Sequence, residues 1–173
     1  MKIRAILAPH VPTPPEVVSA MLNLAGVCAR DIVLDIGCGD GRICIAAARD
    51  YGARAVGVDI EPYWVEQSRA NAATEGVEKL TTFHVADACD WDVVEATVIT
   101  MYLVQWSTQL VAHELLPRAR RGTRVVSHSF PIEGIEPASA QMIPDSEGDA
   151  RKIYLWLVGE NGALVGKTAE GIS

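Results

Sequence analysis

The strongest constraint in the sequence is a glycine-rich turn that follows a short apolar run. Residues 33–42 read Val-Leu-Asp-Ile-Gly-Cys-Gly-Asp-Gly-Arg, which places glycines at the alternate positions Gly37, Gly39 and Gly41. Glycine adopts backbone angles that other residues avoid, and it leaves no side chain between the backbone and a ligand. The free amides at the start of a following helix would face the same space. The stretch therefore predicts a strand, a ligand-binding turn and the start of a helix.

The spacing of the glycines separates two classes of ligand. A dinucleotide-binding turn has the pattern Gly-x-Gly-x-x-Gly, whereas here the third glycine comes one residue early and Arg42 occupies the last position of that pattern. Asp35 lies two residues before Gly37, where its carboxylate would repel a pyrophosphate but would attract a cationic ligand. By itself the turn is also compatible with an ordinary strand-to-helix connection that binds no ligand.

Acidic residues also end the next two apolar runs. Asp59 follows the run 55–58 and is suitably spaced from Asp35 to accept from a pair of ribose hydroxyls; alternatively, it caps the helix predicted from Pro62. Asp87 follows the run 80–85, where its carboxylate is suited to an adenine amino group. Because the carboxyl ends of parallel strands meet at one edge of a sheet, the three acids together indicate a ligand that contains adenosine.

Apolar runs and helical patterns alternate along the chain, and this alternation predicts an α/β fold. Strands are expected at 32–36, 55–60, 80–85, 96–102 and 123–130, with helices between them and a hairpin formed by 140–143 and 152–158. The expected sheet is mostly parallel, with helices on both faces and an antiparallel C-terminal hairpin. At the start of the chain, Thr13 is expected to cap a helix that begins at Pro14. Residues 1–160 would form one domain, with 1–26 as an N-terminal strap and helix, and 161–173 would form a flexible tail.

Charge and cysteine content restrict the partners and the location. The 173 residues carry a formal net charge of -7, so the surface is unsuited to nucleic acid but suits a cationic partner such as a lysine-bearing protein. The four cysteines lack metal-binding spacing, so we expect no metal site and reduced thiols in a cytoplasmic protein. No apolar run is long enough to span a membrane.

The sequence resembles two nested groups of enzymes. The pattern Asp-x-Gly-x-Gly-x-Gly at 35–41 is similar to motif I of the class I S-adenosylmethionine-dependent methyltransferases. Further pieces resemble the small archaeal protein-lysine methyltransferases and related mitochondrial lysine methyltransferases of animals, and these pieces are residues 11–14, 55–58, 95–101 and 122–128. The Pro-Thr-Pro strap and the strand end at 95–101 are the most specific of them. Ser129 departs from the expected pattern, in which an acid follows His128.

The resemblance implies a Rossmann-like class I methyltransferase with a seven-stranded sheet. It also implies that a methyl group passes from S-adenosylmethionine to the ε-amine of protein lysines, leaving S-adenosylhomocysteine. In this assignment Asp35 faces the methionyl end of the cofactor, Asp59 holds the ribose and Thr13 closes over the methionyl carboxylate. The other cofactor-binding residues implied are Gly37, Cys38, Gly39, Ile60, Asp87, Ala88 and Thr100.

The same resemblance places Thr100, Met101 and Tyr102 beside the methyl group and a channel for the substrate lysine. Such a reaction needs no dedicated base, because entry into a water-poor channel lowers the pKa of a lysine. We therefore expect His128, a lone histidine in the fifth strand, to be structural.

Other functions remain compatible with these residues. A methyltransferase for small molecules or RNA would share every cofactor-binding residue, although the acidic composition disfavours RNA. A non-catalytic regulatory protein that binds S-adenosylmethionine would share them too. The protein is expected to be a monomer or a weak homodimer.

Overall fold

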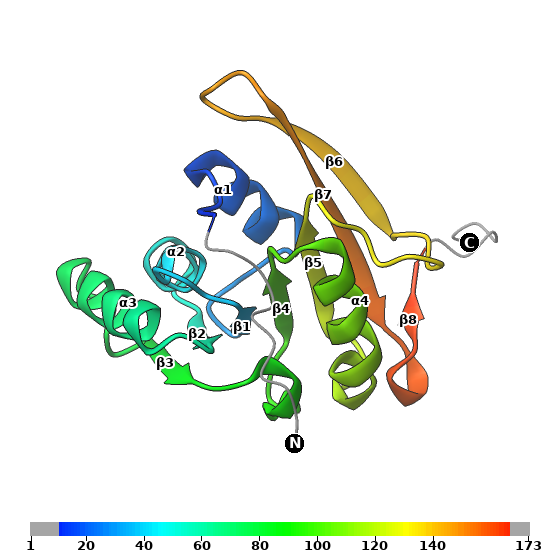
Figure 1. Ribbon diagram of the computed structural model, residues 1–173, viewed down its shortest axis with the longest axis horizontal. Helices are drawn as coiled ribbons and strands as arrows, with labels where there is room; N and C mark the ends of the chain where they lie inside the picture. Colours follow the sequence, from blue (N-terminus) through cyan, green and yellow to red (C-terminus); the bar gives the residue numbers. More distant parts are fainter. Residues whose placement is uncertain (1–10, 167–173) are drawn as a thin grey trace.

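The structure, a computed structural model, describes residues 11–166. A mixed β-sheet forms its centre (Figure 1). The strand order is β3-β2-β1-β4-β5-β7-β6, and the short β8 also pairs with β7. Strands β1 to β5 are parallel, whereas β7 is antiparallel to β5, β6 and β8. The bounds are β1 Ile32–Ile36, β2 Arg54–Asp59, β3 Thr81–Val85, β4 Val98–Met101, β5 Arg124–His128, β6 Ser139–Pro144, β7 Ala150–Val158 and β8 Leu164–Val165. The predicted fold class is therefore confirmed, with β8 as an additional short strand.

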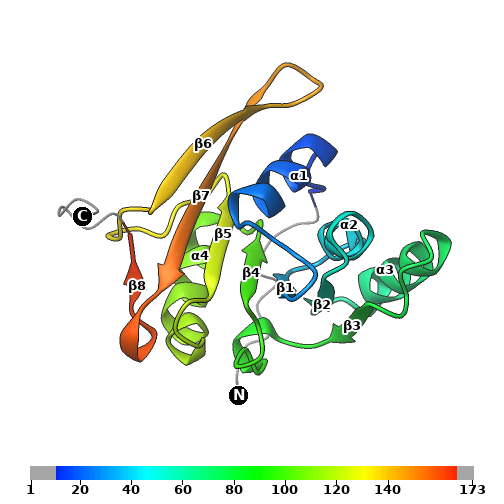
Figure 2. The same ribbon diagram turned by 180° about the vertical axis from the view of Figure 1, so that it is seen from behind.

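Helices cover both faces of the sheet, as the two opposite views show (Figures 1 and 2). Strand side chains alternate between the faces, so Val98 joins the hydrophobic core under α1, α2 and α3, while its neighbour Ile99 joins the core under α4. The helices are α1 Pro15–Leu24, α2 Arg42–Tyr51, α3 Pro62–Thr74 and α4 Gln105–Glu114, and the short 3-10 helices are η1 Ala88–Asp90, η2 Leu116–Arg118 and η3 Glu160–Gly162. Within residues 11–166, no helix is long and apolar enough to cross a bilayer.

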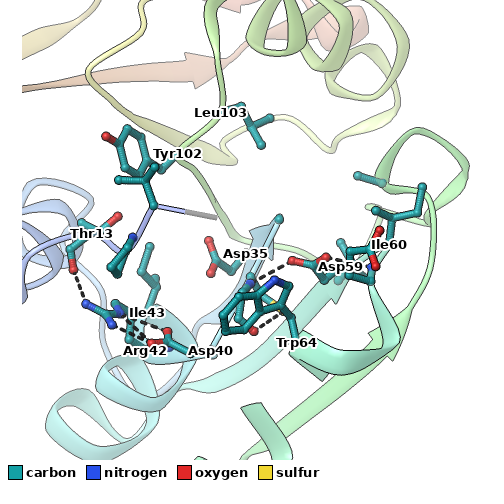
Figure 3. Close-up of a pocket in the computed structure, with 18 of the residues that line it drawn as sticks. Thr13, Asp35, Asp40, Arg42, Ile43, Asp59, Ile60, Trp64, Tyr102 and Leu103 are labelled. Carbon is teal, nitrogen blue, oxygen red and sulfur yellow. Dashed lines mark hydrogen bonds and ion pairs between the residues drawn. The ribbon is translucent and has the colours of Figure 1, made fainter. Parts of the chain in front are cut away.

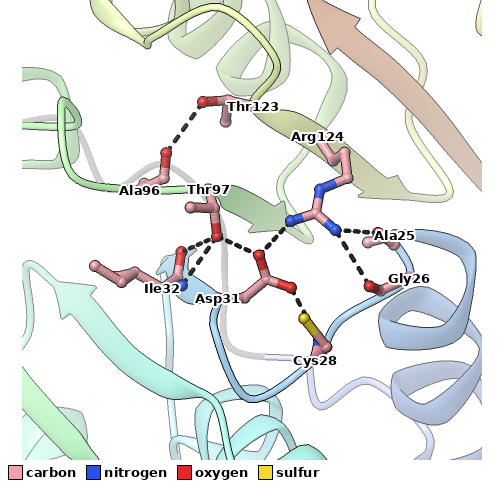
Figure 4. A network of polar contacts seen from close by, with 9 residues as sticks. All are labelled: Ala25, Gly26, Cys28, Asp31, Ile32, Ala96, Thr97, Thr123 and Arg124. Atoms are coloured by element: carbon pink, nitrogen blue, oxygen red, sulfur yellow. Dashed lines mark hydrogen bonds and ion pairs between the residues drawn. The ribbon is translucent and has the colours of Figure 1, made fainter.

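Arg124 of β5 fixes the C-terminal end of α1 to the sheet (Figure 4). Its guanidinium donates to the carbonyl oxygens of Ala25 at 2.8 Å and Gly26 at 3.2 Å, and it pairs with the carboxylate of Asp31. Asp31 also accepts a hydrogen bond from the hydroxyl of Thr97 at 2.7 Å. Because these residues flank α1, β1, β4 and β5, the network sets the position of α1 and hence of the segment that leads into it.

The start of α1 differs from the sequence prediction by one residue. The helix begins at Pro15, and Pro14 is the N-cap residue with an extended backbone at ψ 145°. A residue that precedes proline is disfavoured from helical angles, so Pro14 cannot begin the helix as predicted. Thr13 therefore does not cap α1, and its hydroxyl is turned toward His128 instead. Residues 1–10 of the predicted strap and helix lie outside the described residues.

The first residues of the predicted tail include regular secondary structure. Residues 160–162 form η3, and Leu164 and Val165 of β8 pair with Val158 and Leu157 of β7. A two-residue strand carries no alternating pattern, which explains why the sequence did not reveal it. Residues 167–173 lie outside the described part of the chain.

Candidate functional site

A cavity of about 310 Å³ lies at the carboxyl ends of the parallel strands (Figure 3). One wall is the strap, residues 11–14 before α1. The others are the glycine turn after β1, the end of β2 with the start of α3, and the segments after β3 and β4. The lining residues predicted from the sequence are Thr13, Asp35, Gly37, Cys38, Gly39, Asp59, Ile60, Asp87, Ala88 and Tyr102. The fold thus brings ten of the twelve predicted site residues to one cavity.

The glycine turn has the geometry that its sequence predicts. Gly37, Gly39 and Gly41 have positive φ angles of 71°, 52° and 81°, and the amides of Gly37 and Cys38 both donate to the carbonyl oxygen of Val58 at 2.9 and 3.0 Å. A Cβ atom at Gly41 would lie 2.7 Å from the Cβ of Ser68 in α3. The positive φ angles therefore favour glycine at all three positions, and the packing against α3 also requires it at Gly41.

Asp35 lies behind the turn, where its carboxyl is almost fully buried. The parallel register of β1 and β4 places Thr100 beside it, and the Thr100 hydroxyl donates to the Asp35 carboxyl at 2.7 Å. Burial raises the pKa of Asp35 to about 7, and the neighbouring charges of Asp59 and Asp40 act in the same direction. The ionised form of this carboxyl is stabilised by any cation that enters the cavity.

Asp59 connects two walls of the cavity. One oxygen of its carboxylate accepts from the amide of Gly39 at 2.9 Å, and the other accepts from the amide of Glu61 at 3.0 Å. The alternative prediction, that Asp59 is the N-cap of α3, is wrong because Glu61 is the N-cap residue. Asp87 follows β3 and is the N-cap of η1, where its carboxylate accepts from the amide of Cys89 at 3.0 Å.

The strap is held over the cavity by Arg42, at the first turn of α2 (Figure 3). The Arg42 guanidinium donates to the carbonyl oxygen of Thr13 at 2.8 Å, and Asp40 holds it in an ion pair of 2.6 Å. This role was not predicted from the sequence, where Arg42 served only to exclude a dinucleotide fingerprint. The contact joins residues 29 positions apart, and no local pattern reveals such a contact.

Of the three residues predicted for the substrate channel, one lines the cavity. Tyr102 lines the cavity, but Thr100 and Met101 are fully buried and are not among its lining residues. Met101 belongs to the core on the α4 side of the sheet, since neighbouring strand residues point to opposite faces. Thr100 reaches the site through its hydrogen bond to Asp35.

His128 lies below the strap and is fully buried. Its Nδ1 is 3.3 Å from the hydroxyl oxygen of Thr13, and its ring packs on Tyr102 with 3.8 Å between the ring centroids. Burial, and secondly the charge of Arg151, lowers the pKa of His128 to about 4. The imidazole is therefore neutral at neutral pH.

Acidic side chains dominate the cavity. Besides Asp35, Asp59 and Asp87 it is lined by Asp40 and Glu61, whereas Arg42 is the one cationic side chain among its described lining residues. Trp64 of α3 and Leu103 after β4 add apolar surface that was not assigned to the site from the sequence. This lining favours a ligand that combines positive charge with flat apolar groups.

The chain was compared with known protein families. The family described as the ANTKMT methyltransferase domain matches residues 35–139, which is more than half of the sequence. The chain belongs to this family. The match begins at the motif I acid, near the end of β1, and includes β2 to β5.

Proteins similar in sequence to this chain include protein-lysine methyltransferases. A protein-lysine N-methyltransferase of Saccharolobus islandicus is 39% identical over 154 residues, which are 88% of this chain and 95% of that protein. A lysine N-methyltransferase of Homo sapiens, named for one of the subunits of ATP synthase, is 33% identical over 133 residues, which are 75% of this chain but only 55% of the human protein.

A solved structure resembles the chain over nearly its whole length. It is the crystal structure of a protein described as an RNA methyltransferase from Salinibacter ruber, in complex with S-adenosyl-L-homocysteine. That protein is 42% identical, with a TM-score of 0.81, and the match covers 87% of this chain and 95% of the other. Together with the family match, this similarity confirms the predicted class, a Rossmann-like methyltransferase.

Proposed function

We propose that this member of the ANTKMT methyltransferase domain family transfers a methyl group from S-adenosylmethionine to the ε-amine of lysines in proteins. The observation that carries the proposal is the acidic cavity at the carboxyl ends of β1, β2 and β3. There the three strand-end acids Asp35, Asp59 and Asp87 lie beside the glycine turn. The similarity to the Saccharolobus islandicus protein-lysine N-methyltransferase supports the choice of substrate.

The lining residues fit such a cofactor. Gly37, Cys38 and Gly39 would present backbone to its methionyl part, and Asp35 would favour its positive charge. The carboxylate of Asp59 would accept from the ribose hydroxyls. Further cofactor contacts are assigned to Ile60 on the adenine face, Asp87 and Ala88 at the adenine edge, and Thr13 over the methionyl carboxylate.

The chemistry requires little of the side chains. The cofactor supplies an activated methyl group on a sulfonium, so the protein has to align the attacking amine and exclude water. Tyr102 and Leu103 provide the wall after β4 at which the lysine would enter, and desolvation there lowers the pKa of its amine. His128 lies behind Tyr102 and does not line the cavity, so it is not assigned the role of a base.

RNA is the second candidate substrate, because the Salinibacter ruber protein carries that description. RNA binding relies on cationic side chains that neutralise phosphates. Here five acids and a single arginine line the described cavity, and that arginine is already paired with Asp40. The charge of the site therefore favours a lysine over a nucleotide, and a small amine or a purely regulatory role remains an outcome for experiment.

A cytoplasmic location and a monomer or weak homodimer form part of the proposal. The absence of disulfides among the four cysteines, all of which are free thiols, supports a reducing compartment.

Transfer of labelled methyl groups tests the proposal directly. The protein would be incubated with methyl-labelled S-adenosylmethionine and, in separate reactions, with a protein extract, total RNA and a mixture of small amines. We expect label in protein, released as methylated lysine on hydrolysis. Label confined to RNA or to small amines would refute the lysine assignment, and binding of the cofactor without transfer to any acceptor would indicate a regulatory protein.

A further inference from the structure

His128 occupies a place where packing alone would favour an apolar ring. It is the last residue of β5, fully buried, and pairs in register with Ile153 of β7. Within the described residues its Nε2 has no hydrogen-bond partner, and an unpaired buried polar atom costs stability. A phenylalanine would fill the same space without that cost. The chemistry of the imidazole must therefore serve another purpose.

The two groups that His128 contacts lie on different walls of the cavity. Its Nδ1 meets the hydroxyl of Thr13 on the strap, and its ring face meets the ring of Tyr102 after β4. Both Thr13 and Tyr102 line the cavity, whereas His128 does not. The proposed function assigns Thr13 to the cofactor and Tyr102 to the substrate lysine, so His128 touches a residue from each half of the site.

The direction of the Thr13 side chain depends on its contact with His128. Arg42 holds the carbonyl oxygen of Thr13, which fixes the backbone but leaves the hydroxyl free to rotate. The Nδ1 atom of the neutral imidazole accepts from the Thr13 hydroxyl in one tautomer and donates to it in the other, and either hydrogen bond sets the direction of the hydroxyl. The neighbouring ring of Phe130, 6.5 Å from that of Tyr102, completes the packing around Tyr102.

We propose that His128 is a positioning residue that aligns the strap with the substrate wall, holding Thr13 through Nδ1 and Tyr102 through its ring face. The inference rests on the proposed function and adds a residue to it. One buried side chain thereby couples the cofactor half of the site to the substrate half.

Two substitutions separate the two contacts. His128→Phe keeps a ring against Tyr102 but loses the hydrogen-bond partner of Thr13, and His128→Asn keeps a polar atom near the position of Nδ1 but loses the ring. His113→Phe is the matched control, because His113 is on the surface of α4 with 86% of its side chain exposed. Affinity for S-adenosylhomocysteine would be measured by calorimetry, and kcat and KM would be measured for transfer to poly-L-lysine.

The expected results differ between the two variants. His128→Phe should weaken S-adenosylhomocysteine binding by roughly threefold to tenfold, the effect of losing one hydrogen bond, and leave the KM for poly-L-lysine near that of the wild type. His128→Asn should keep the cofactor affinity and raise the KM by a similar factor of roughly three to ten, the effect of losing an aromatic contact. His113→Phe should match the wild type in both.

A double variant tests whether Thr13 acts through His128. The loss of affinity caused by Thr13→Val should be smaller in the His128→Phe background, because the contact between the two side chains is already absent there and only the proposed direct contact of Thr13 with the cofactor is still lost. Should His128→Phe fail to fold, His128→Leu takes its place, since leucine also lacks the ring nitrogen that contacts Thr13. The inference is overturned if His128→Phe, or in its place His128→Leu, binds S-adenosylhomocysteine like the wild type, or if the two losses simply add.

These results are distinct from a failure of the proposed function. If the wild-type protein binds S-adenosylhomocysteine but labels no lysine, the substrate assignment fails, and the calorimetric comparison still decides the contact between His128 and Thr13. If wild-type protein labels lysine while all His128 variants behave like it, the proposed function stands and the role of His128 is refuted.

Discussion

Asp59 holds two loops in position at the end of β2. Its carboxylate accepts one backbone amide from the glycine turn and one from the start of α3. Asp59→Ala removes both acceptors and also the group proposed to hold the ribose. Since hydrogen bonds to a charged group contribute about 1.5–3 kcal/mol each, we expect binding of S-adenosylhomocysteine to weaken by at least about 100-fold, beyond the range of ordinary calorimetry.

The control for this variant is Asp50→Ala. Asp50 is near the end of α2 and pairs with Arg49 on the surface, so its loss should leave the cofactor affinity unchanged. Wild-type affinity in Asp59→Ala would contradict the assignment of the ribose site.

Asp35 should make cofactor binding dependent on pH. Because burial and then the charges of Asp59 and Asp40 raise its pKa to about 7, the carboxyl of the free protein is protonated below that pH and ionised above it. A cationic cofactor prefers the ionised form, so affinity for S-adenosylmethionine should increase from about pH 6 to about pH 7.5. Asp35→Asn should weaken binding and remove this slope. A wild-type affinity that is constant over the same range would refute the role of Asp35.

The strap is an element whose position depends on α2. The carbonyl oxygen of Thr13 accepts from Arg42, and Asp40 fixes the guanidinium. In Arg42→Ala the strap loses this contact, so bound S-adenosylhomocysteine should dissociate about ten times faster, as expected for one charge-assisted hydrogen bond that is partly exposed to water. Stopped-flow displacement measures this rate.

Arg49→Ala provides the control for this variant. Arg49 is on the same helix and pairs with Asp50 and Glu75 on the surface, and it does not line the cavity. Its substitution should leave the dissociation rate unchanged. Equal rates in Arg42→Ala and the wild type would mean that the strap does not retain the cofactor.

The sequence predicted those parts of the site that follow from single elements. Asp35, Asp59 and Asp87 were found because each ends a strand, and the ends of parallel strands meet at one edge. Contacts between distant elements were not visible in the same way. Arg42 reaches the strap, Met101 is turned away from the cavity by strand alternation, and β8 is too short to show a pattern. These features depend on strand register and tertiary packing, which local sequence patterns do not reveal.

The overall charge of the protein distinguishes the candidate substrates. The protein carries a net charge of -7, and the cavity has five acids against one arginine among its described lining residues. Such a surface accelerates the approach of a lysine-rich protein and opposes that of RNA. A change of charge at the cavity should therefore affect the two substrates in opposite directions.

Glu61→Lys tests this difference. Glu61 is exposed at the cavity, and reversing its charge should lower kcat/KM for poly-L-lysine by roughly fivefold, as expected for two units of charge acting through water. Glu66→Lys changes the net charge equally at an exposed position of α3 that does not line the cavity, so it should have a much smaller effect. If RNA were the substrate, Glu61→Lys would instead increase transfer to it, because the new ammonium would neutralise a phosphate. The sign of the change therefore identifies the substrate class even before the natural target is known.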